Sequence, residues 1–242
     1  MKRLILSALL AGLCGSAAAQ VPVTGAGIGA SSGGGGGSQS VWNPSDKNAS
    51  VTLSTTNITN DTATTAASSW VGVRGSTSYS TGTSHKVVFA ITGAGVDGND
   101  GWIGGLADST TSLSSYLGAS GVSLGIQTAI TGGGCSPGIC TYASGGVTIE
   151  DQTCHITANG QTMYLAINFN NGHVFCGIGC STWANSGNPD SDTGYMATLA
   201  GSTTYFAAWA GIEIASISPV GVINTAPFLG GCSNVSSFGQ WG

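Results

Sequence analysis

A β-hairpin centred on Asn171 and Gly172 is the feature that most constrains this fold. Asn-Gly accepts the positive φ angles of a type I′ turn, whose twist matches that of two antiparallel strands. A two-residue turn places Asn170 opposite His173 and Phe169 opposite Val174. Because side chains alternate between faces, one face is then wholly apolar: Leu165, Ile167, Phe169, Val174, Cys176 and Ile178. The other face suits a more hydrated surface: Ala166, Asn168, Asn170, His173, Phe175 and Gly177.

The composition extends this hairpin to an all-β chain. Only 6% of the 242 residues are charged, against roughly a quarter in an average soluble protein. Glycine is frequent, with 41 residues, and the chain lacks the helical periodicity of Leu-, Lys- and Glu-rich sequences. Short apolar segments alternate with Gly-rich turns and predict roughly ten to twelve strands. We therefore expect a two-sheet antiparallel sandwich.

The N-terminus has the three parts of a secretory signal peptide. Lys2 and Arg3 precede an apolar run over 4–13, and small residues at 17–19 mark a cleavage site. The apolar run is too short to span a bilayer, so we expect no membrane insertion after cleavage. We predict a signal peptide over 1–19, a Gly/Ser-rich linker over 20–40 and one folded domain over 41–242, located outside the cytoplasm as a secreted, periplasmic or virion-associated protein.

The cysteines predict disulfides. Cleavage removes Cys14 and leaves an even number in an exported chain: Cys135, Cys140, Cys154, Cys176, Cys180 and Cys232. Short spacing favours Cys135 with Cys140 and Cys176 with Cys180, which leaves Cys154 with Cys232. The spacings do not match the C-x2-C pairs of zinc sites, so we predict no metal there.

The charges exclude one class of partner. The domain has three basic side chains, Lys47, Arg74 and Lys86, and the whole chain has a net charge of -5. Three scattered cations cannot neutralise a run of phosphates, so we expect no nucleic acid partner.

Catalytic patterns are weak. Glycoside hydrolases of sandwich fold need two carboxylates roughly 5 to 10 Å apart. The chain has two glutamates, Glu150 and Glu213, and adjacent Glu150 and Asp151 point to opposite faces of an extended strand. We therefore predict no enzyme activity and no cofactor.

A polar loop after the hairpin is the predicted ligand-binding region. An indole ring beside amide and carboxylate groups suits a sugar, and the candidate residues are Trp183, Asn185, Asn188, Asp190 and Asp192. For Trp183 itself, the general burial tendency of tryptophan favours packing beneath its loop over exposure. The oxygen atoms in 97–100 and 188–192 could hold calcium, but Asx-type turns explain these sequences more simply.

Five segments in order resemble the SPRY-like (B30.2-related) domains of bacteriophage tail and bacterial surface proteins. They are VWNPSDKNASVTLS, SWVGVRGSTSYSTGTSHKVVFAI, GWIGGLADSTTSLSSYLG, LAINFNNGHVFCGIGCSTWANSGNPDSDTG and the closing TAPF and FGQW, within 41–241. The resemblance implies a concanavalin A-like jelly roll that recognises proteins or glycans without catalysis. The chain departs from the family pattern at Asn168, where an acidic residue is common, and at 177–180.

These observations predict a non-catalytic recognition module that binds a glycan or protein at a cell surface, on a phage tail or an exported bacterial protein. A structural or decorative virion or envelope protein without a dedicated ligand is the first alternative. A secreted glycoside hydrolase of similar fold is the second.

Overall fold

The computed structural model describes residues 41–54, 60–94, 101–119, 122–127, 141–143, 154, 160–212, 220–225 and 232–241. These residues all belong to one unit, Gly33–Gly242. The predicted signal peptide and linker lie outside the described residues, as do Cys135, Cys140 and the predicted loop over 97–100.

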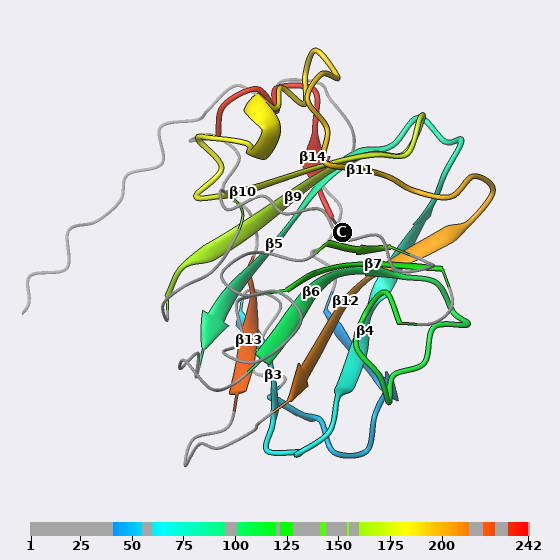
Figure 1. Ribbon diagram of the computed structural model, residues 1–242, viewed down its shortest axis with the longest axis vertical. Helices are drawn as coiled ribbons and strands as arrows, with labels where there is room; N and C mark the ends of the chain where they lie inside the picture. The colour runs from blue at the N-terminus through cyan, green and yellow to red at the C-terminus, as the bar shows by residue number, and fades with distance from the viewer. Residues whose placement is uncertain are drawn as a thin grey trace, which may run out of the picture. The chain divides into compact units, whose positions relative to one another are not determined.

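Two sheets form a β-sandwich, as predicted (Figure 1). The first contains, in spatial order, β1 (Trp42–Lys47), β4 (Val71–Ser80), β12 (Thr204–Ile212), β6 (Gly101–Ala107), β7 (Ser123–Gln127) and β8 (Thr141–Ala143). The second contains β11 (Ala197–Thr198), β10 (His173–Ile178), β9 (Thr162–Asn168), β5 (Lys86–Ala94), β13 (Val220–Thr225), β3 (Asn60–Thr65) and β2 (Thr52–Ser54). Neighbouring strands in both orders are antiparallel.

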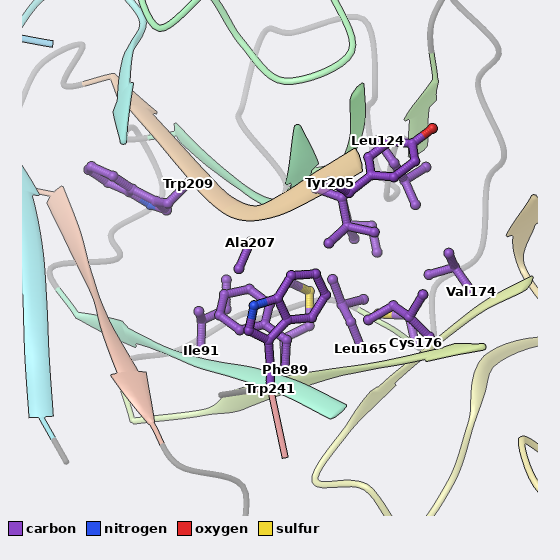
Figure 2. Close-up of a cluster of buried hydrophobic side chains, with 14 of the residues drawn as sticks. Phe89, Ile91, Leu124, Leu165, Val174, Cys176, Tyr205, Ala207, Trp209 and Trp241 are labelled. Carbon is purple, nitrogen blue, oxygen red and sulfur yellow. The ribbon is translucent and has the colours of Figure 1, made fainter. Parts of the chain in front are cut away.

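The core lies between the sheets and is built from alternate residues of the central strands. Figure 2 shows side chains of β5 and β9 in the second sheet facing side chains of β12 in the first. The core-facing residues of these strands follow the two-residue period of a strand: Val87, Phe89, Ile91, Met163, Leu165, Ile167, Tyr205, Ala207 and Trp209. Burial of each large side chain stabilises the fold by about 1.5–3 kcal/mol.

The hairpin forms with a longer turn than predicted. Asn168 pairs with His173 and Leu165 with Cys176, so a four-residue loop over 169–172 replaces the two-residue turn. Gly172 has the positive φ of 78°, and its N–H donates to the Asn168 carbonyl at 2.8 Å. The predicted pairing was therefore wrong by two residues. Because two is even, every side chain keeps its predicted face, and the apolar face does point into the core.

The other face of the hairpin is less hydrated than predicted. Ala166 and Phe175 are buried in a second apolar cluster with Val88 of β5. Four residues from two later segments cover them: Cys180, Trp183, Val235 and Phe238. We call these seven residues the outer cluster. It lies on the face of the second sheet that points away from the core.

The C-terminal segment passes from the outer cluster into the core. β14 (Gly239–Gln240) runs parallel to β5 and pairs with Val87 and Val88, beyond the part of β5 that pairs with β13. Trp241 then enters the space between the sheets, where its ring centroid lies 4.9 Å from that of Tyr79 and 5.6 Å from that of Phe169. β14 therefore adds a short strand beside β5, and Trp241, the residue after it, belongs to the core.

The two disulfides among the described residues differ from the predicted pairs Cys176–Cys180 and Cys154–Cys232, while the predicted pair Cys135–Cys140 lies outside the described residues. Cys154 is bonded to Cys176 and Cys180 to Cys232, with Cα–Cα distances of 5.7 and 4.9 Å. The pairing of Cys176 with Cys180 was wrong because the two residues lie on opposite sides of the sheet: Cys176 is in the core and Cys180 is in the outer cluster.

Disulfides of this kind suggest an oxidising, extracytoplasmic environment. Among the described residues, no helix has the length and hydrophobicity that crossing a membrane requires.

Candidate functional site

The loop between β10 and β11 carries all five predicted ligand-binding residues, but it does not bring them together. Trp183 is buried in the outer cluster, with 3% of its surface exposed. Its indole N–H donates to the Ser233 carbonyl at 2.9 Å. Trp183 therefore packs beneath its loop, as the burial tendency of tryptophan predicted, and supports the loop from below.

Asn185 and Asn188 shape the loop in different ways. Asn185 lies in the 3-10 turn η1 (Ala184–Ser186), is exposed and has a φ of 55°. Asn188 forms a backbone bridge with Thr193. Its side-chain oxygen accepts a hydrogen bond from the Ser191 N–H at 3.1 Å. This is the Asx-type turn chemistry that we expected for 188–192.

Asp190 fastens the loop to the C-terminal segment. Its carboxylate accepts four hydrogen bonds: from Ser236 N–H (2.9 Å) and Oγ (2.8 Å), and from Ser237 N–H (3.0 Å) and Oγ (2.8 Å). Burial alone would raise the pKa of this carboxyl, but the four hydrogen bonds outweigh burial and hold the pKa below its usual value. Asp190 is therefore a structural anchor between two segments that are far apart in sequence. In Figure 1, the yellow η1 lies beside the red C-terminal segment.

Asp192 is the centre of a second hydrogen-bond network, which joins the loop to the hairpin. Asn168 Nδ2 donates to Asp192 Oδ1 at 3.3 Å, and Asn171 Nδ2 donates to Oδ2. His173 Nδ1 lies 3.1 Å from the same Oδ2. The loop therefore lies against the turn and the first residue of β10.

Tyr195 is the functional candidate that the sequence analysis missed. Among the described residues, Tyr195 is the one large hydrophobic residue that is exposed, with 42% of its surface accessible. Its ring stacks on the His173 imidazole, with centroids 3.7 Å apart and planes inclined by 14°. Asp192 contacts the same imidazole. One face of this partly exposed ring is therefore covered by an imidazole that Asp192 contacts.

We define the Tyr195 surface as Tyr195, His173, Asn171 and Asp192. It combines an aromatic face with an amide and a carboxylate. Of the predicted residues, Asp192 belongs to it, while Asp190 and Trp183 support the loop that carries it. The hydroxyls of Ser191 and Thr193, exposed residues of the same loop, lie 3.0 Å apart.

The two aspartates of this loop bind different partners. Asp190 accepts from Ser236 and Ser237, whereas Asp192 contacts the hairpin. In the described part of the chain, no group of three or more His, Cys, Asp or Glu side chains is placed to hold a metal ion.

Comparison with solved structures identifies the architecture. No family model and no curated protein sequence matches the chain. The SPRY domain of human HERC1 is similar, with a TM-score of 0.52 and 11% identity, over 76% of this chain and 97% of that domain. The potassium-bound Emp46p carbohydrate recognition domain aligns with a TM-score of 0.46 and 11% identity, over 74% of this chain and 86% of that domain. The fold is thus a SPRY-like, concanavalin A-like sandwich, as the sequence resemblance implied.

Proposed function

We propose that this protein is a non-catalytic recognition module that binds a glycan or a protein at a cell surface through the Tyr195 surface. The observation that carries the proposal is the exposed ring of Tyr195, stacked on His173. Exposed tyrosines are common in binding sites because they combine a rigid apolar face with a polar tip. The setting that we propose, a phage tail or an exported bacterial protein, rests on the leader pattern and the sequence resemblance.

The support beneath the Tyr195 surface favours binding over a purely structural role. Three separate devices hold the loop: the Asp192 network, the Asp190 hydrogen bonds and the Cys180–Cys232 disulfide. A loop ordered before binding loses less conformational entropy when a ligand arrives. The immobilised polar groups around an accessible ring are thus arranged as in a preorganised site.

The fold agrees with this proposal. In sandwiches of this kind, loops at the strand ends can vary while the two sheets keep their packing. Here Asp192 and Tyr195 lie on the loop between β10 and β11, and the disulfides fit display outside the cytoplasm.

Retention of the purified, oxidised full chain on intact cells tests the proposal. We expect saturable binding to the cells that carry the ligand, and competition by unlabelled protein. If neither cells nor immobilised surface polymers retain the oxidised chain, the recognition function is wrong and a structural role without a ligand replaces it. If the chain releases reducing ends from a polysaccharide, and Glu150→Gln abolishes this release, the hydrolase alternative replaces it.

A further inference from the structure

The charges around the Tyr195 surface identify the class of ligand, provided that the proposed function is correct. All ten acidic residues of the chain lie between residues 41 and 242, but only three basic residues do. An anionic glycan or phosphate-bearing polymer needs cations at its binding site. The surroundings of Lys47, Arg74 and Lys86 therefore decide whether an anionic ligand can bind.

Two of the three basic residues lie on strands of the first sheet, and their side chains are already hydrogen-bonded. Arg74 is buried, and its guanidinium binds both oxygens of Asp46, at 2.7 and 2.8 Å, and the carbonyls of Asp108 and Thr111. The Lys47 ammonium donates to the Val51 carbonyl at 2.8 Å. Neither charge is available to a ligand on the second sheet.

Lys86 is the basic residue that shares a sheet with the Tyr195 surface. It pairs with Asn168 of β9, which in turn pairs with His173 of β10. Neighbouring strands lie about 4.8 Å apart, so the backbones of Lys86 and His173, which are two strands apart, are about 10 Å from each other. Its ammonium lies over the Phe238 ring, 5.6 Å from the ring centroid, and so points toward the C-terminal segment.

The Tyr195 surface itself carries a negatively charged group. Asp192 places a carboxylate within it, and a positive charge on His173 would be offset by Asp192 Oδ2 at 3.1 Å. A carboxylate, sulfate or phosphate group at Tyr195 would therefore meet an anion directly and a cation only at a distance. Repulsion at this range disfavours anionic ligands.

We propose that the Tyr195 surface binds an uncharged carbohydrate. The C–H groups on one face of a pyranose ring match the apolar face of Tyr195, while its hydroxyls both donate and accept, as do the amide of Asn171 and the hydroxyls of Ser191 and Thr193. A protein partner fits less well, because a specific protein interface buries about 800 Å² on each side and usually centres on several large anchors. Here the described surface offers one such anchor.

The test measures binding of the oxidised full chain to immobilised polysaccharides of both kinds. Mannan, galactan and dextran are the neutral probes, and alginate and heparin are the anionic ones. We expect binding to at least one neutral probe, with an affinity that changes less than about twofold between about 50 and 500 mM NaCl because no net charge is paired. Lys86→Gln should leave that affinity unchanged, as should the matched control Thr52→Ala at an exposed position on β2.

Each other outcome overturns the inference in a recognisable way. Binding to alginate or heparin that weakens steeply with salt and with Lys86→Gln would make the ligand anionic, while the recognition function would stand. Binding to cells through a protease-sensitive partner, with no polysaccharide bound, would make the ligand a protein. If the chain binds neither cells nor any of the polysaccharides, the proposed function itself is refuted.

Discussion

Replacement of Asp190 by Asn tests how the loop and the C-terminal segment are joined. In Asp190→Asn one carboxylate oxygen becomes an NH2 group that faces a backbone N–H of Ser236 or Ser237, and this N–H cannot turn away. One hydrogen bond is lost and the other three lose their charged acceptor. Hydrogen bonds to charged groups contribute about 1.5–3 kcal/mol and neutral ones about 0.5–1.5 kcal/mol.

Solvent reduces these values, because Asp190 is only half-buried. We therefore expect the free energy of unfolding to fall by about 2 kcal/mol at pH 7. For a domain of about 200 residues this lowers Tm by about 4–8 °C. Ser236→Ala, which removes one hydroxyl donor and keeps the carboxylate, should cost about 1 kcal/mol.

The effect of Asp190→Asn should depend on pH. The hydrogen bonds from Ser236 and Ser237 outweigh burial and lower the pKa of Asp190 in the folded state. Its carboxylate therefore contributes stability that is fully present above the unfolded pKa of about 3.9 and is lost as pH falls through the folded pKa. The difference in stability between wild type and Asp190→Asn should accordingly shrink below about pH 4.

Urea denaturation at neutral and acidic pH measures this difference, and hydrogen exchange locates it. Exchange in Asp190→Asn should rise first in the peptide that covers 232–241. Equal stability of the variant and wild type at pH 7, or a difference that persists unchanged in acid, would refute the assignment of Asp190 as the anchor.

Three further predictions concern the framework. Trp241→Ala should lower the free energy of unfolding in urea by about 3–5 kcal/mol because it empties part of the core; a loss below about 1 kcal/mol would show that Trp241 is not packed there. Arg74→Met should lower the free energy of unfolding by about 3 kcal/mol because it leaves Asp46 without its partner, and Arg74→Lys should lower it less. Equal losses in the two variants would contradict the bidentate pair of Arg74 and Asp46. Peptide mapping without reduction should find Cys180 joined to Cys232, and replacing both by Ser should cost about 2–4 kcal/mol; Cys180 joined to any other cysteine would contradict the fold.

The hairpin shows what sequence patterns predict well. Alternation of apolar and polar residues decides which face of a strand points inward, and this prediction was confirmed. The same pattern is indifferent to a shift of two residues, so it could not distinguish the predicted turn from the four-residue loop. Two hydrogen bonds stabilise the longer loop: the Asn170 N–H donates to Asn168 Oδ1, and the His173 N–H donates to Asn171 Oδ1.

The cysteine pairs show where spacing fails. Only three residues lie between Cys176 and Cys180, but the chain leaves β10 and turns between them, with Gly179 at a φ of 73°. Which face each thiol reaches depends on this turn, and short sequence separation says nothing about it. Cys232 reaches Cys180 because the C-terminal segment returns over the outer cluster.

The candidate site was only partly predictable. The polar composition of 181–192 predicted a binding loop, and the structure places Asp192 and, three residues later, Tyr195 in the loop between β10 and β11. The partners that bury Trp183 could not be predicted, because they belong to the distant segment 232–238. Tyr195 follows a glycine at the end of this loop, and that position was the available signal. Its stacking on His173 depends on the tertiary fold.

The affinity of Tyr195→Ala for the ligand is the most direct test of the central claim that this ring is the binding face. Titration calorimetry of the full chain with a bound neutral polysaccharide should show at least a roughly tenfold loss in Tyr195→Ala, about 1.4 kcal/mol. Tm should change little, because the ring is largely exposed. Unchanged affinity in a folded Tyr195→Ala variant would contradict the account and place the binding surface elsewhere on the sandwich.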